Sequence, residues 1–92
     1  MKYIKVRWLH SSSDTPIWLY SELNLASSEL RKVEVYASGH MDFADRDQQS
    51  GSTSLGIEPL PSLEEIAANP EFEPVEISAE EFEAIWATAR SA

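Results

Sequence analysis

The stretch KYIKVRWLH, residues 2–10, decides the fold that we expect for this chain. Its residues alternate, so that Ile4, Val6 and Trp8 fall on one side of an extended chain. The other side carries Tyr3, Lys5 and Arg7. A period of two predicts a strand with one buried face. Such a strand needs neighbouring strands beside it and a second layer across its apolar side.

Three further runs, residues 17–22, 29–37 and 41–45, are rich in strand-forming residues. Gly39 lies between the last two runs, where a tight hairpin needs a positive φ. The four runs predict an antiparallel meander. Residues 71–77 follow Pro70 and contain Pro74 and alternating glutamates, a pattern typical of a surface crossing or a fifth, edge strand.

Two capping boxes predict two helices. Ser62 and Glu65 open a short helix, and Ser78 and Glu81 open the last one. In the last helix Phe82, Ile85 and Trp86 recur at helical spacing, and we expect them to cover Ile4, Val6 and Trp8.

The sequence therefore predicts one α+β domain over residues 1–92. We expect a four-stranded antiparallel meander packed against a C-terminal helix, with a short helix before it. Residues 46–58 are polar or small and predict a long loop. In a compact domain so long a connection is usually functional or disordered.

Charge is the strongest signal in the composition. The formal net charge is -9, and residues 42–92 hold twelve acidic residues against two basic ones. A surface of this sign repels phosphate backbones and attracts basic proteins. We therefore expect a basic protein partner and no nucleic acid, although acidic surfaces also simply keep small domains soluble.

The chain has no cysteine, which excludes a disulfide framework and a thiolate metal site. Neither a signal-peptide pattern nor a run of apolar residues long enough for a bilayer is present. We expect a cytoplasmic protein without a membrane contact.

Three patterns resemble chemical sites, and each has a plainer explanation. His10, three serines and Asp14 have triad residue types, but neighbours in one loop rarely converge. His10 and His40 could hold a metal with an aspartate, but they lack close ligand spacing. Residues 45–56 resemble a calcium loop but have Ser50 and Gly56 where glycine and glutamate belong. We expect no catalytic residues, no metal and no cofactor.

The remaining candidates concern binding. Acidic residues on the last strand, the long loop and the first helix form a rim, for which a solvated face is the plainer explanation. The expected partner-binding residues are acids of this rim together with Leu60 or Trp18 as an apolar anchor. They are Asp42, Asp45, Asp47, Glu58, Leu60, Glu64 and Trp18. A second candidate is an aromatic face of the sheet, which would suit a protein interface or single-stranded RNA unless another segment covers it. Its members would be Tyr3, Trp18, Tyr20 and Tyr36.

Taken together, the pieces KYIKVRWLH, LYSEL, RKVEVYASG, FAD, LGIEPLPSLEEI and PEFEPVEISAEEFEAIW resemble a family of small bacterial proteins that carry a domain of unknown function. This resemblance implies a stand-alone cytoplasmic domain and brings no established activity. Small acidic bacterial domains are often immunity proteins, which is an argument by association.

Three functional hypotheses follow. The first is an immunity-type inhibitor that neutralises a basic toxin domain by protein contact. The second is a homodimeric regulatory or adaptor domain that pairs through a strand edge or the aromatic face. Across the hypotheses, the chain is expected to be either a monomer or a homodimer. The third is a small-ligand binder or enzyme that uses His10 or His40.

Overall fold

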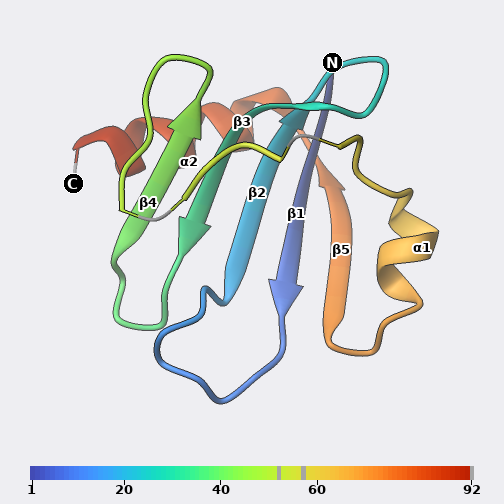
Figure 1. The fold of residues 1–92 in the computed structure, drawn as a ribbon, viewed down its shortest axis with the longest axis horizontal. Coiled ribbons are helices and arrows are strands. Elements are labelled where there is room, and N and C mark those ends of the chain that lie inside the picture. The colour runs from blue at the N-terminus through green and yellow to red at the C-terminus, as the bar shows by residue number, and fades with distance from the viewer. Residues whose placement is uncertain (52, 57, 92) are drawn as a thin grey trace.

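The computed structural model describes residues 1–51, 53–56 and 58–91, which form one antiparallel sheet and two helices (Figure 1). The elements in chain order are β1 (Lys2–Trp8), β2 (Trp18–Leu23), β3 (Glu29–Val35), β4 (Met41–Asp45), α1 (Leu63–Ala67), β5 (Phe72–Ile77) and α2 (Ala79–Ser91). The sheet has five strands in the order β4-β3-β2-β1-β5. No helix within the described residues is long and apolar enough to cross a membrane.

The α+β class, the C-terminal helix and the short helix before it are confirmed. The sheet has one strand more than the expected four-stranded meander, because residues 72–77 form β5, the edge strand that the sequence left open as an alternative, and β5 joins β1. The proline and glutamates of this segment are compatible with an edge position, where a strand needs only one partner.

Helix α2 covers one face of the sheet. In Figure 1 it crosses behind the strands at one end of the sheet. Phe82, which is fully buried, and Trp86 pack with Val33 of β3. The ring of Trp86 meets that of Phe43 edge-on, with 5.6 Å between centroids, and Tyr3 lies 5.4 Å from the Phe82 ring. This aromatic layer is one of the two cores of the protein.

The expectation that the last helix covers Ile4, Val6 and Trp8 is wrong. The helix residues concerned were Phe82, Ile85 and Trp86, and all three lie on the opposite face of the sheet. Ile4 and Val6 pack instead with Leu63 and Ile66 of α1 and with Leu60 of the loop. Alternation shows which residues share a face, but both faces of β1 carry large side chains, so it could not show which face the helix takes.

Strand register explains the division into two faces. On the α2 face Tyr3, Glu22 and Arg31 are direct neighbours across β1, β2 and β3. On the α1 face Val6, Leu19 and Glu34 are neighbours across the same strands. The expected aromatic face is therefore divided, because Tyr36 follows Val35 on β3 and falls on the side opposite to Tyr3.

Both edges of the sheet are protected. Along β4, Ser50 N donates to Phe43 O at 2.8 Å, and Asp45 N donates to Gln48 O at 2.8 Å. On the other side Pro74 removes a donor from β5, and α1 packs against this strand. These features oppose the addition of a strand from another chain.

Candidate binding groove

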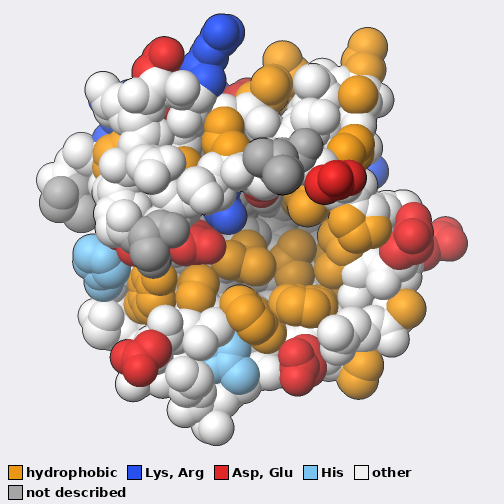
Figure 2. Space-filling model, viewed as in Figure 1, with side chains coloured by type: hydrophobic (Ala, Val, Ile, Leu, Met, Phe, Trp, Pro, Cys, Tyr) orange, Lys and Arg blue, Asp and Glu red, His pale blue; other side chains and the backbone are white. Residues whose placement is uncertain are grey.

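A groove opens on the α1 face of the sheet, between the long loop and α1. Its volume is about 470 Å³. Figure 2 shows it as a hollow with an apolar base and charged side chains around it. The lining residues used below are Ile4, Val6, Trp8, Leu19, Ser21, Glu29, Lys32, Glu34, Leu60, Glu65, Ile66 and Phe72. The groove is mainly apolar with a polar end.

The apolar part comes from β1, β2, β5, α1 and the loop. Ile4 and Val6 form the base and are almost fully buried. Trp8 and Phe72 lie beside them with ring centroids 5.4 Å apart, and both remain partly exposed. Half-buried aromatic side chains in a hollow are a common feature of ligand and partner sites.

The α1 wall depends on a local sequence signal. Ser62 Oγ accepts a hydrogen bond from Glu65 N at 3.2 Å, and Ser62 N donates to Glu65 Oε1 at 3.3 Å. This is the capping box that the sequence predicted, and it fixes the start of the helix. Ile66 of α1 then faces the groove.

The polar end lies on β3. The Lys32 ammonium is 3.5 Å from Glu34 Oε2, and both side chains are largely buried. Glu34 also accepts a hydrogen bond from the hydroxyl of Thr53, which is 2% exposed. A lysine and a carboxylate thus stand at the end of an apolar groove.

Carboxylates of the sheet hold the long loop in place. Asp42 accepts from Ser50 Oγ at 3.2 Å, Glu34 accepts from Thr53, and Glu29 Oε1 accepts from Gly56 N at 2.7 Å. Each acceptor lies on β3 or β4, so the loop is fastened over the polar half of this face. The apolar half over β1 and β2 stays open as the groove.

Both histidines are engaged by neighbouring groups. Ser12 N donates to His10 Nδ1 at 3.1 Å, so Nε2 carries the proton and donates to Pro16 O at 2.7 Å. His40 Nε2 lies 3.0 Å from Asp42 Oδ1 and is mostly exposed. Within the described part of the chain, no three histidine or acidic side chains are placed to hold a metal ion.

The structure separates the residues predicted to bind a partner. Leu60 lines the groove, and Glu58 and Glu64 are exposed on the loop and on α1. Asp42 is 5% exposed and is engaged with His40 and Ser50. Trp18 lies on the α2 face.

The two other acids of the rim lie at the end of β4 and in the turn that follows it. Asp45 Oδ1 accepts from Asp47 N at 2.8 Å and from Gln48 N at 2.7 Å, so Asp45 shapes this turn. Asp47 is exposed. Of the seven residues, Leu60 lines the groove, and Glu58 and Glu64 lie on the loop and the helix that border it; their binding role stays a prediction.

Sequence reasoning missed Lys32, Glu34 and Glu29 as groove residues. Their position depends on register, since Leu19 faces Glu34 and Ser21 faces Lys32 across β2 and β3. Alternation within one strand does not supply register between strands, because turn geometry and bulges also set it. No signal in the sequence would have found them.

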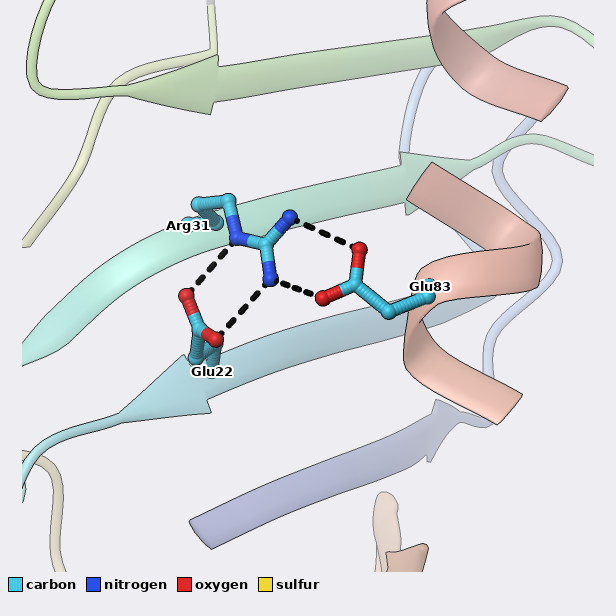
Figure 3. Close-up of polar contacts among 3 residues, drawn as sticks. All are labelled: Glu22, Arg31 and Glu83. Atoms are coloured by element: carbon cyan, nitrogen blue, oxygen red, sulfur yellow. Dashed lines mark hydrogen bonds and ion pairs between the residues drawn. The ribbon is translucent and has the colours of Figure 1, made fainter. Parts of the chain in front are cut away.

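The opposite face holds a second polar cluster (Figure 3). Arg31 donates from Nε to Glu22 Oε1 at 2.7 Å and from Nη2 to Glu22 Oε2 at 2.9 Å. It also donates from Nη1 to Glu83 Oε1 at 3.0 Å and so joins β3 to α2. These hydrogen bonds hold the pKa values of Glu22 and Glu83 below their ordinary range and raise the pKa of Arg31.

This cluster supports the fold. Glu22 is 8% exposed, and the Arg31 guanidinium lies 5.0 Å from the Phe82 ring centroid and 5.1 Å from that of Trp86. Burial raises the pKa of the nearby Tyr3 hydroxyl, and Glu22 adds to this effect. Because every charged group of the cluster is engaged by another, it offers no open site.

Trp18 lies at the end of the α2 face away from this cluster. The Lys5 ammonium is 5.2 Å from its ring centroid, and the Arg7 guanidinium is 5.7 Å away. These cations cover part of the indole.

Comparison with known proteins gives the family and nothing finer. No curated protein and no solved structure matches the chain. A family model described as "Domain of unknown function (DUF6881)" matches residues 2–91. The chain therefore belongs to this family of uncharacterised domains.

Proposed function

We propose that this chain is a cytoplasmic bacterial binding protein that inhibits a basic protein partner, as an immunity protein neutralises a toxin domain. The observation that carries the proposal is the apolar groove on the α1 face with carboxylates in and around it. Glu29, Glu34 and Glu65 line the groove, and Glu58 and Glu64 are exposed on the loop and the helix that border it.

The two parts of this surface have different physical roles. Exposed carboxylates on a chain of net charge -9 accelerate the encounter with a basic protein. The apolar groove then slows dissociation, because an anchor side chain buried in a hollow dominates binding energy. Inhibition follows when the bound chain covers the active site of its partner, which requires no catalytic group.

The engaged ring nitrogens of His10 support a binding protein over an enzyme. The protected sheet edges support a monomer over a dimer that pairs edge to edge. Analytical ultracentrifugation checks the second point, and a dimer that persists at micromolar concentration would contradict it.

A charge-reversal experiment tests the proposed function. Tagged wild-type protein, the double variant Glu58→Lys/Glu64→Lys and the control Glu73→Lys/Glu80→Lys are used to capture partners from a lysate of the native host. The control reverses two exposed carboxylates on β5 and α2, away from the groove. We expect wild type and control to retain one basic protein that elutes as salt rises.

The groove-side variant should lose this protein, with an association rate reduced roughly tenfold or more. Stoichiometric addition of the wild-type chain should then abolish the purified partner's activity. Equal capture by all three proteins, or recovery of the bait alone, would contradict the proposal.

The groove volume favours a second candidate, a small-ligand binder. About 470 Å³ lies within the range of roughly 300–1,000 Å³ that is typical of ligand pockets. Thermal unfolding in the presence of a metabolite library tests it, and a specific rise in melting temperature with one compound would favour this function.

A further inference from the structure

The groove also indicates which chemistry it accepts, an inference that rests on the proposed function. We infer that the groove receives an extended segment of the partner in which a large apolar side chain and an arginine or lysine stand two residues apart. The apolar side chain would lie between Leu19, Leu60 and Phe72, and the cation would reach Glu34.

Exposed apolar surface in the groove supplies the first step of the argument. Leu19, Leu60, Phe72 and Ile66 all remain partly exposed around the buried base. They come from β2, the loop, β5 and α1, so the hollow is enclosed by four segments of the chain. An apolar side chain placed there exchanges contact with water for contact with carbon on several sides.

Charge supplies the second step. The lining contains three carboxylates, from Glu29, Glu34 and Glu65, and one ammonium, from Lys32. Lys32 lies 3.5 Å from Glu34 and offsets one of these three charges, so the lining as a whole keeps an excess of negative charge. A cationic group complements this end, and an anionic group is repelled by it and by the net charge of the chain.

Geometry supplies the third step. Glu34 is the direct cross-strand neighbour of Leu19. Neighbouring strands are about 4.8 Å apart, and side chains two residues apart in an extended segment lie on the same side, roughly 6.7 Å apart. One segment lying across β2 and β3 can therefore place an apolar side chain beside Leu19 and a basic one at Glu34.

Short peptides test this chemistry without knowledge of the partner. The probe is acetyl-Phe-Gly-Arg amide, compared with acetyl-Phe-Gly-Glu amide and acetyl-Gly-Gly-Arg amide by amide chemical shifts of the isotope-labelled chain. We expect the first peptide to shift signals of Leu19, Lys32 and Phe72 and to bind roughly fivefold or more tightly than either comparison peptide.

Variants locate the site. Leu60→Ser and Ile66→Ala remove apolar walls and should each weaken the first peptide severalfold. Val75→Ser changes an exposed valine on the α2 face and should leave the affinity unchanged. Two different wall variants keep the test valid if one of them fails to fold, which circular dichroism checks.

Several outcomes would overturn the inference. They are binding of the glutamate peptide as tight as that of the arginine peptide, no shifts at the groove, or an equal effect of Val75→Ser. Tighter binding of 2-phenylethylammonium than of the peptide would also overturn the inference, because the occupant of the groove would then be a free small molecule and not a segment of a partner. If the captured partner binds Leu60→Ser normally but not Glu58→Lys/Glu64→Lys, the inference fails while the proposed function stands.

Discussion

Removal of Arg31 tests the cluster that joins the sheet to α2. In Arg31→Met the apolar stem remains beside the Phe82 and Trp86 rings, but Glu22, 8% exposed, loses the guanidinium that donates two hydrogen bonds to its carboxylate and neutralises it. Breaking a buried ion pair at one partner costs about 3–5 kcal/mol. Because Arg31 keeps 20% of its side chain exposed, we expect the lower end, about 3 kcal/mol.

Urea unfolding at pH 7, followed by tryptophan fluorescence, measures this loss. With a slope of about 1–2 kcal/mol per molar urea, the midpoint falls by roughly 1.5–3 M. The matched control is Lys5→Met, which removes a cation from the same face. The partner of Lys5 is Glu81, whose side chain is 45% exposed, so the control should cost about 1 kcal/mol or less.

The pH dependence adds a second criterion. In the wild type the pKa of Glu22 is lowered, so the stability from this pair is complete above the ordinary carboxylate pKa and is lost as pH falls through the lowered value. In Arg31→Met the buried carboxyl has a raised pKa and gains a proton at low pH. The difference between the two proteins should therefore shrink below about pH 5. A loss under about 0.5 kcal/mol at pH 7, or a difference that grows toward low pH, would refute the reasoning.

Three further changes test the packing and the loop. Trp86→Ala should cost about 3–5 kcal/mol in urea unfolding, because Trp86 is 8% exposed and fills the core under α2; a surface-like loss would contradict this. Gly51→Ala should cost about 2–4 kcal/mol, since φ is +58° and a Cβ would lie 2.5 Å from Asp42 Oδ2. The control Gly39→Ala, with φ +93° and nothing within 4 Å of a Cβ, should cost only about 1 kcal/mol, and equal losses would exclude the contact with Asp42 as the cause. Ser62→Ala should cost about 0.5–2 kcal/mol and reduce protection of α1 amides from hydrogen exchange, and unchanged exchange would argue against the cap.

Elements of this fold could be predicted from the sequence wherever a local rule applies. Alternation located β1, and the capping boxes located both helices, because each depends on residues close together in the chain. The face that α2 covers could not be predicted in this way. Tyr3 on the other side of β1 forms an aromatic layer with Phe43 and Phe82, and this layer exists only once the strands are paired.

The candidate site was predictable only in part, for the same reason. Leu60, Glu58 and Glu64 were found as charged or apolar residues at loop and helix positions. Asp42 looked equivalent to them in the sequence, but Gly51 and Ser50 of the loop fold onto its carboxylate. An acidic residue therefore cannot be assigned to a partner until the fold shows whether the chain itself uses it.

That distinction changes the meaning of the acidic second half of the chain. Asp42 and Asp45 order the loop, Glu65 caps α1 and Glu83 holds Arg31, so these carboxylates have intramolecular roles. No hydrogen bond or ion pair joins the Glu58 or Glu64 side chain to another described residue, and both are exposed on segments that border the groove. These two carboxylates make no contact that stabilises the fold, and apolar surface nearby stays partly exposed. A basic partner with an apolar anchor would complement both features.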